Sequence, residues 1–203
     1  SGYIPNFKGV KIITFKPIFF SLTKLRKIGF FGRILHSTQG NYMLYKLCKK
    51  ALSDFRGEAL VYAYEVNGVK AGYKLKEEFG LPFVTRFQGT ILTNVKDTLI
   101  NRLRKYPHFQ ALETKADLLI MTDDGTQGNK VLDKLNNQSS EIKFWKNGVD
   151  IDLESEDNKM ISKKHLGLAP SDRVLMTVSR LASWKKVDRA IKALSVVIKQ
   201  NKN

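Results

Sequence analysis

Six short apolar runs, separated by segments with helical periodicity, constrain the fold of this chain more than any other feature. Each run is largely continuous rather than alternating, as is typical of strands buried on both faces of a parallel sheet. The predicted strands are Val10–Phe15, Ala59–Val66, Phe83–Phe87, Leu118–Thr122, Ile142–Trp145 and Val174–Val178. Their alternation with helical segments predicts an α/β fold with a doubly wound, Rossmann-like parallel sheet.

One strand–helix–strand unit is especially well delimited. A helix is predicted over residues 68–79, where Gly80 suits the position after the helix end and Pro82 prevents continuation. With the runs on either side, this segment forms a βαβ unit. Further helices are predicted over Tyr42–Phe55 and from a cap at Asp123 or Asp124 through Leu135.

The chain is strongly basic. Its 203 residues carry 35 Lys and Arg against 19 Asp and Glu, a formal net charge of +16. Such a balance predicts polyanionic partners, namely nucleic acid, anionic lipid or phosphorylated substrates. RNA-binding aromatic signatures and zinc-finger patterns are absent from the sequence, so nucleic acid ranks below a membrane surface and none is expected as a partner.

Cations and aromatic residues interleave over residues 16–35. This mixture is typical of a segment that lies on an anionic membrane surface, with aromatic rings at the headgroup level. The alternative is a buried helix with a basic outer face, and Gly29 and Gly32 argue against one long helix there. The longest apolar runs fall short of the roughly 18 residues needed to span a bilayer. We therefore expect a cytoplasmic protein with peripheral membrane contact.

Several common catalytic patterns are absent from the sequence. It contains no G-x-G-x-x-G, no phosphate-binding G-x-x-x-x-G-K-[ST], no C-x-x-C and no H-E-x-x-H. Its histidines, His36, His108 and His165, lack the spacing of metal ligands, so no metal site is predicted. Cys48 is the only cysteine and is expected to be a buried structural thiol.

Three loops that follow predicted strands carry candidate ligand-binding residues. In open α/β sheets, ligands bind beyond the carboxyl ends of the strands. The loops contain Gln88, Gly89 and Thr90; Asn147, Gly148 and Asp150; and Arg180 with Lys185. The last pair precedes a predicted helix, and a guanidinium and an ammonium there suit a phosphate or diphosphate. Taken singly, the first two loops could be ordinary turns, and Arg180 and Lys185 could be a pair of solvated cations.

Together, the order and spacing of these loops resemble the family 4 retaining glycosyltransferases of GT-B fold. The similarity runs from about Ala59 to the end of the chain. It is carried by the segments Tyr62–Gly72, Phe79–Thr90, Ala116–Thr126, Trp145–Asp150 and Val178–Ile191. The resemblance implies an acceptor-side domain over residues 1–150, and a linker with the first βα unit of a nucleotide-sugar domain over residues 151–203.

The resemblance also implies roles for the loops. Arg180 and Lys185 match the pair that holds the donor diphosphate. Asn147 to Asp150 match the motif that enters the inter-domain connection, and Gln88 to Thr90 match an acceptor or cleft loop. The implied reaction moves a sugar, with retention, from a nucleotide-sugar to a glycan or lipid-linked acceptor in polysaccharide or glycolipid biosynthesis. No metal and no cofactor beyond the nucleotide-sugar co-substrate is implied.

Two positions depart from the family pattern. Gln88 stands where the family often has histidine, and it cannot serve as an acid or base; Lys186 stands where the family often has glycine. The glycine-rich first loop and the paired donor-site glutamates of the family have no match in this chain. We therefore expect these residues to be a fragment that is inactive alone, with its catalytic carboxylates elsewhere.

Two other functions remain open at this point. A different GT-B activity, such as a sugar-phosphate synthase or a phosphorylase, would use phosphate as the acceptor. A basic α/β module that binds RNA or anionic lipid without catalysis would also account for the charge.

Overall fold

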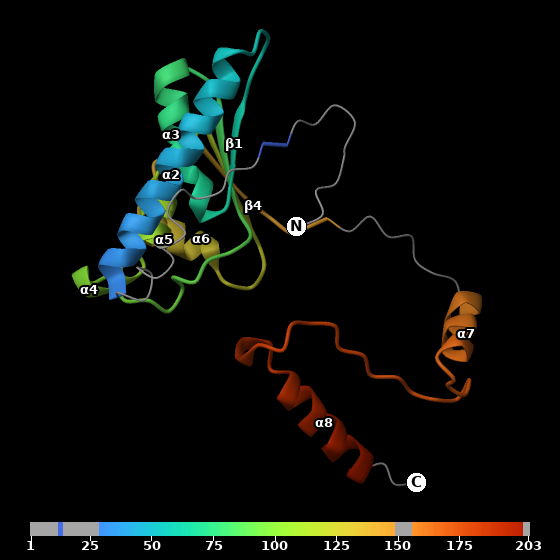
Figure 1. The fold of residues 1–203 in the computed structure, drawn as a ribbon. Coiled ribbons are helices and arrows are strands. Elements are labelled where there is room, and N and C mark those ends of the chain that lie inside the picture. The colour runs from blue at the N-terminus through green and yellow to red at the C-terminus, as the bar shows by residue number, and fades with distance from the viewer. Residues whose placement is uncertain (1–11, 14–28, 149–155, 201–203) are drawn as a thin grey trace. The chain divides into compact units, whose positions relative to one another are not determined.

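The computed structural model describes residues 12–13, 29–148 and 156–200 of the chain (Figure 1). These residues fall into two compact units, Ser1–Val149 and Asp150–Asn203. The first unit holds a sheet with its covering helices, and the second holds helices only among its described residues.

The first unit is built on a four-stranded parallel sheet. Its strands are β1 (Val61–Tyr64), β2 (Phe83–Phe87), β3 (Leu118–Thr122) and β4 (Glu141–Trp145), hydrogen-bonded in the order β1-β2-β3-β4. Val61 pairs with Phe83, and Leu118 pairs with both Val84 and Glu141. The predicted α/β class with a parallel sheet is thus confirmed, and the sheet is consistent with a Rossmann-like fold; the strand order of the described residues has no reversal, so the predicted double winding is not seen in them. β1 is shorter than predicted because Val66 already belongs to the following helix.

Five helices accompany this sheet in the described residues. They are α2 (Gly29–Ser53), α3 (Val66–Phe79), α4 (Leu99–Arg104), α5 (Tyr106–Glu113) and α6 (Gly128–Lys134). α3 packs on β1 and β2, and α2 runs alongside α3 (Figure 1). The core between helices and sheet is mainly apolar, with Thr85 and Thr122 also buried, and its largest fully buried side chains are Phe83, Phe87, Leu112, Leu119, Met121 and Leu132. This burial supplies the main stabilisation of the unit.

Glycines of α3 set its distance from the sheet. A Cβ atom built at Gly72 would lie 2.5 Å from Cε2 of Phe83, and one at Gly68 would lie 3.6 Å from Cβ of Ala63. Only a residue without a side chain fits at Gly72 unless Phe83 moves. Gly72, the last residue of the Tyr62–Gly72 segment, therefore has a packing role. Gly80 ends α3 in the left-handed conformation (φ 64°), as predicted.

The prediction for the amino-terminal helix was wrong in extent. α2 is continuous from Gly29 to Ser53, whereas a helix was expected only from Tyr42. Each internal glycine costs a helix about 1 kcal/mol, but packing against a neighbouring helix can outweigh that cost. Here Asn41 Oδ1 accepts a hydrogen bond of 3.2 Å from Ala71 N of α3, and Lys49 forms an ion pair with Glu78. Residues 16–28 of the basic segment lie outside the described residues.

The second unit contains α7 (Glu156–His165), a 3₁₀ turn (Ser183–Lys185) and α8 (Val187–Gln200). The helix predicted after Lys186 is therefore present, but the strand predicted at Val174–Val178 is not formed. A strand requires a hydrogen-bonded neighbour, and no described residue of this unit provides one. Of the strand predicted at Val10–Phe15, only Ile12 and Ile13 are described, and they are not in a strand.

Among the described residues, none of the helices combines the length and apolarity required to cross a membrane.

Candidate functional site at the carboxyl edge of the sheet

Polar residues follow every strand at the carboxyl edge of the sheet. Glu65 follows β1, Gln88 follows β2, Asp123 follows β3, and Asn147 comes two residues after β4. Because all four strands are parallel, these residues lie along the same edge. This is the edge at which open α/β sheets bind ligands.

A chain of hydrogen bonds joins the residues after β1, β2 and β4. Glu65 Oε1 accepts a bond of 2.7 Å from Gln88 N. Gln88 Oε1 accepts one of 3.0 Å from Asn147 Nδ2, and Asn147 Oδ1 accepts one of 3.0 Å from Arg86 Nη2. The structure thus brings together Gln88 and Asn147, from two loops that the sequence marked separately. Gly148 is exposed beside them, and Asp150 lies outside the described residues.

A second group of contacts fixes the loop that contains Gly89 and Thr90. Thr90 N donates a 3.0 Å hydrogen bond to Thr126 Oγ1, and Thr126 N donates one of 3.0 Å to Asp124 Oδ1. Gly89 has φ +146°, and a Cβ atom there would lie 2.1 Å from Asp124 Oδ2. Glycine is therefore required at this position, where two loops approach each other closely.

The helix cap predicted at Asp123 or Asp124 was wrong. α6 begins at Gly128, with Gln127 before it in the left-handed conformation (φ 53°). Asp124 is used locally instead, because its carboxylate accepts both the amide and the hydroxyl of Thr126. Short acidic side chains commonly bond their own backbone two residues later in this way.

Sequence reasoning missed Glu65, which has the most unusual backbone at the edge. Its φ of 61° and ψ of 174° fall in a region that is essentially restricted to glycine. Glu65 N donates to Arg86 O at 2.8 Å, and its carboxylate holds Gln88 N, so both ends of the residue are restrained. Glu65 lies inside the run predicted as the strand Ala59–Val66, so the pattern did not mark it as a residue that follows a strand.

Arg86 reaches across the edge from β2. Its Nη2 atom is bonded to Asn147, but its Nε atom is buried without a hydrogen-bond partner in the described part of the chain. Buried donors are nearly always satisfied, so an unpaired one marks a place where a ligand or ordered water would be stabilised.

A basic cavity of about 540 Å³ lies next to Glu65. Its charged and ionisable lining residues come from α2, from the end of β1 and from the α4–α5 region: Arg33, His36, Glu65, Arg104, Lys105 and His108. Burial lowers the pKa of His108, and the nearby charge of Lys105 lowers it further. Both effects favour the neutral form of the His108 imidazole.

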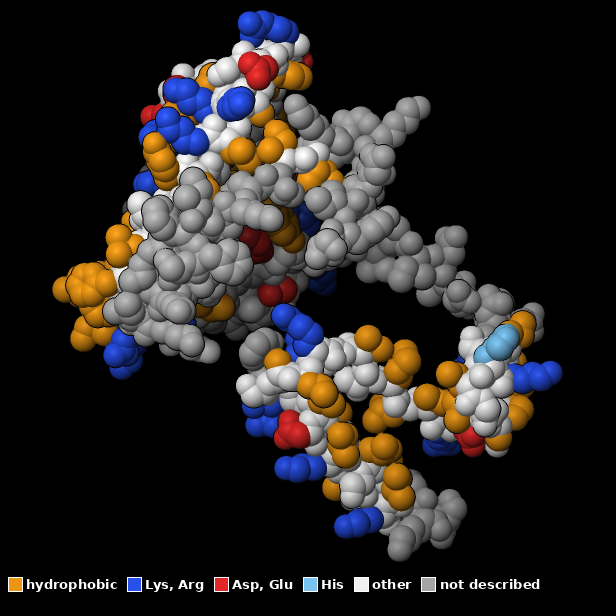
Figure 2. All heavy atoms as spheres, viewed as in Figure 1, with side chains coloured by type: hydrophobic (Ala, Val, Ile, Leu, Met, Phe, Trp, Pro, Cys, Tyr) orange, Lys and Arg blue, Asp and Glu red, His pale blue; other side chains and the backbone are white. Residues whose placement is uncertain are grey.

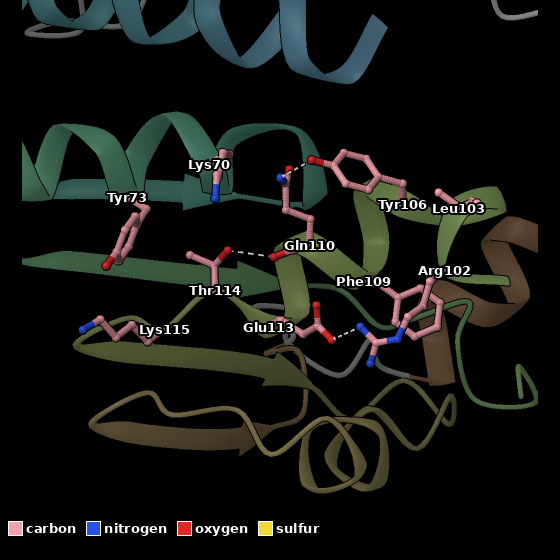
Figure 3. Close-up of a pocket in the computed structure, with 10 residues that line it drawn as sticks. All are labelled: Lys70, Tyr73, Arg102, Leu103, Tyr106, Phe109, Gln110, Glu113, Thr114 and Lys115. Carbon is pink, nitrogen blue, oxygen red and sulfur yellow. Dashed lines mark hydrogen bonds and ion pairs between the residues drawn. The ribbon is translucent and has the colours of Figure 1, made fainter. Parts of the chain in front are cut away.

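Another cavity, of about 520 Å³, lies among α3, α4 and α5 (Figure 3). Several of its polar groups are bonded to one another: Arg102 pairs with Glu113 at 2.6 Å, and Gln110 Nε2 donates to Tyr106 Oη at 2.6 Å. A ligand would have to displace these bonds. The carboxyl edge and its basic cavity are therefore the better candidate site.

Arg180 and Lys185 belong to the second unit and are both exposed. Lys185 ends the 3₁₀ turn, and Lys186 after it is left-handed (φ 54°) while its carbonyl accepts Arg189 N of α8 at 2.9 Å. A left-handed residue at this position is more easily provided by glycine than by lysine. Glycine in place of Lys186 would therefore relieve backbone strain at the start of α8.

Burial raises the pKa of the half-buried Cys48 thiol, which makes it a poor nucleophile. Among the described residues, no group of three or more His, Cys, Asp or Glu side chains is placed to hold a metal ion. No protein-family model and no curated protein matches this chain.

Proposed function

We propose that the chain belongs to a glycosyltransferase of GT-B type that moves a sugar, with retention, from a nucleotide-sugar to a glycan or lipid-linked acceptor. The observation that carries the proposal is the bonded chain of Glu65, Gln88, Asn147 and Arg86 at the carboxyl edge. Two separate motifs of the resemblance supply Gln88 and Asn147. Amides and carboxylates fixed in this way are suited to sugar hydroxyls, which both donate and accept hydrogen bonds.

The proposal gives each marked loop a role. Gln88, Gly89 and Thr90 contact the acceptor or form the wall of the cleft. The side-chain oxygen of Gln88 is already bonded to Asn147, so the side-chain NH₂ group of Gln88 is the part that contacts a ligand. Arg180 and Lys185 hold the donor diphosphate, where fixed cations stabilise the negative charge that grows as the glycosidic bond breaks.

The proposal also includes peripheral contact with the cytoplasmic face of an anionic membrane through residues 16–35. The described part of this segment is the start of α2, where Phe31 is 65% and Leu35 57% exposed on either side of the exposed Arg33. Exposed aromatic and aliphatic groups beside a cation favour the membrane interface. Sedimentation with vesicles that contain phosphatidylserine, compared with phosphatidylcholine alone, tests this. Equal binding to both would contradict an electrostatic contact.

Sugar transfer is tested with the protein expressed together with the coding sequence that flanks these residues, because the resemblance predicts donor-site glutamates there. Release of nucleoside diphosphate from a panel of nucleotide-sugars is the expected result, and NMR of the product gives its anomeric configuration. A sugar phosphate as product would indicate a synthase or phosphorylase instead. Salt-sensitive RNA binding without any affinity for nucleotide-sugars would favour a non-catalytic polyanion-binding module.

A further inference from the structure

The basic cavity beside Glu65 has an unbalanced charge. Three permanent cations line it, namely Arg33 from α2, Arg104 at the end of α4 and Lys105 between α4 and α5. Glu65 is the one carboxylate among the described lining residues, and its Oε1 atom is engaged by Gln88 N. The cavity therefore concentrates positive charge within the first unit.

The amino end of α3 adds to this charge. Val66 and Asn67, the first two residues of the helix, line the cavity, and the Glu65 side chain does not cap the helix. The first amides of a helix have no partner within the helix, and the helix dipole is positive at that end. Side-chain cations and backbone donors thus converge on one space.

One of these cations is bonded to another element that lines the cavity. Arg33 Nη1 donates to the carbonyl of Arg104 at 3.4 Å, which ties α2 to the end of α4. Lys105 is half-buried, and its backbone carbonyl accepts His108 N of α5 at 2.9 Å. These bonds fix the backbone that carries Arg104 and Lys105, and of the three cationic groups only the Arg33 guanidinium is itself bonded, within the described part of the chain, before an anion arrives.

We propose that this cavity binds a phosphate group of the acceptor substrate. Identifying the ligand as the acceptor rests on the proposed sugar transfer; the phosphate site itself does not. Arginine provides a planar pair of donors that matches phosphate oxygens, and lysine provides a compact charge. The cavity adjoins the carboxyl edge through Glu65, so a phosphate held there would place the rest of the acceptor near Gln88.

The phosphate could belong to a lipid headgroup or to a water-soluble molecule. Ile91 (52% exposed) lines the cavity, and Leu99 (73%) and Ile100 (61%) are exposed on α4, the helix whose last residue is Arg104. Figure 2 shows hydrophobic side chains gathered over α4, with Lys and Arg beside them. Acyl chains would cover such a surface, whereas a soluble phosphate would leave it in water.

Calorimetric titration of the full chain with glycerol 3-phosphate tests the site. Saturable binding is expected, and Arg104→Gln or Lys105→Gln should each weaken it about tenfold. Lys130→Gln, which removes an exposed cation from α6, is the matched control and should leave binding unchanged. Absence of binding, or an equal loss with Lys130→Gln, would overturn the phosphate site. Arg104 is exposed, so its variant should fold, and circular dichroism checks this.

Dihexanoyl phosphatidic acid, titrated as monomers, identifies the source. It carries the same phosphate monoester with two short acyl chains, so tighter binding than glycerol 3-phosphate supports a lipid-linked acceptor. Equal affinity supports a water-soluble one. Phosphate binding without sugar transfer would contradict the proposed function alone, and sugar transfer without phosphate binding would contradict this site alone.

Discussion

The carboxylate of Glu65 accepts a 2.7 Å hydrogen bond from the backbone amide of Gln88, and this contact joins the ends of β1 and β2. Glu65 makes it from a backbone conformation (φ 61°, ψ 174°) that normally only glycine adopts. The hydrogen bond of the Glu65 side chain stabilises the folded protein, whereas the strained backbone of Glu65 destabilises it. The two effects therefore oppose each other in the free energy of unfolding.

Variants of Glu65 separate these two effects. Glu65→Gln keeps an acceptor oxygen and should change the free energy of unfolding little. Glu65→Ala loses the bond to Gln88 N and keeps the strain, so it should be destabilised by about 1 kcal/mol. Glu65→Gly loses the bond but releases the strain, and should be more stable than Glu65→Ala by about 1–3 kcal/mol. Urea unfolding measures all three, and an alanine variant as stable as the glycine variant would refute the strain.

Gly72 is expected to be essential for packing. Gly72→Ala places a Cβ atom 2.5 Å from Cε2 of Phe83 and should destabilise the first unit by about 1–3 kcal/mol. Gly40→Ala is the matched control, because its Cβ atom meets nothing within 4 Å and it lies inside α2. It should stabilise the protein by about 0.5–1 kcal/mol. Thermal unfolding compares the two, and similar shifts for both would argue against close packing of α3.

The contacts of Asp117 should make the protein less stable in acid. The pKa of Asp117 is lowered mainly by its ion pair with Lys76 and also by the 2.8 Å bond from Phe83 N. A carboxyl whose folded pKa is below its unfolded value, about 3.9, stabilises the fold above that value. This contribution disappears as the pH falls through the lower folded pKa.

Asp117→Asn should therefore reduce the dependence of unfolding free energy on pH between about pH 5 and pH 3. Urea unfolding at several pH values measures the slope. Asp133→Asn, which changes an exposed carboxyl on α6, serves as the control. An unchanged slope in Asp117→Asn would show that this carboxyl does not link folding to protons.

The proposed donor site gives a kinetic prediction. Arg180→Ala and Lys185→Ala should each lower kcat about 100- to 1,000-fold, the effect of removing one preorganised group that stabilises transition-state charge. KM for the nucleotide-sugar should change less, because the charge is largest in the transition state. Lys192→Ala, on the exposed surface of α8, controls for charge alone. Unchanged turnover in Arg180→Ala would remove Arg180 from the site.

Local pattern was enough to predict most of the sheet. β2 and β3 have the predicted bounds, and β4 differs by one residue, because short apolar runs between helical segments favour buried parallel strands. The sequence pattern predicted the wrong structure where contacts with neighbouring elements decide whether a strand or helix forms. Val174–Val178 has the composition of a strand, but no described residue of its unit pairs with it. α2 continues through glycines because α3 packs along it.

The sequence by itself determined the fold class, the βαβ unit from β1 to β2 and the loops that carry polar residues. These follow from periodicity and from turn residues, which act over a few positions. Only the tertiary structure decided that Gln88 and Asn147 meet, that Glu65 joins them, and that Arg33, Arg104 and Lys105 surround one cavity. Such contacts join residues far apart in the chain, and their geometry depends on how the strands pair and the helices pack.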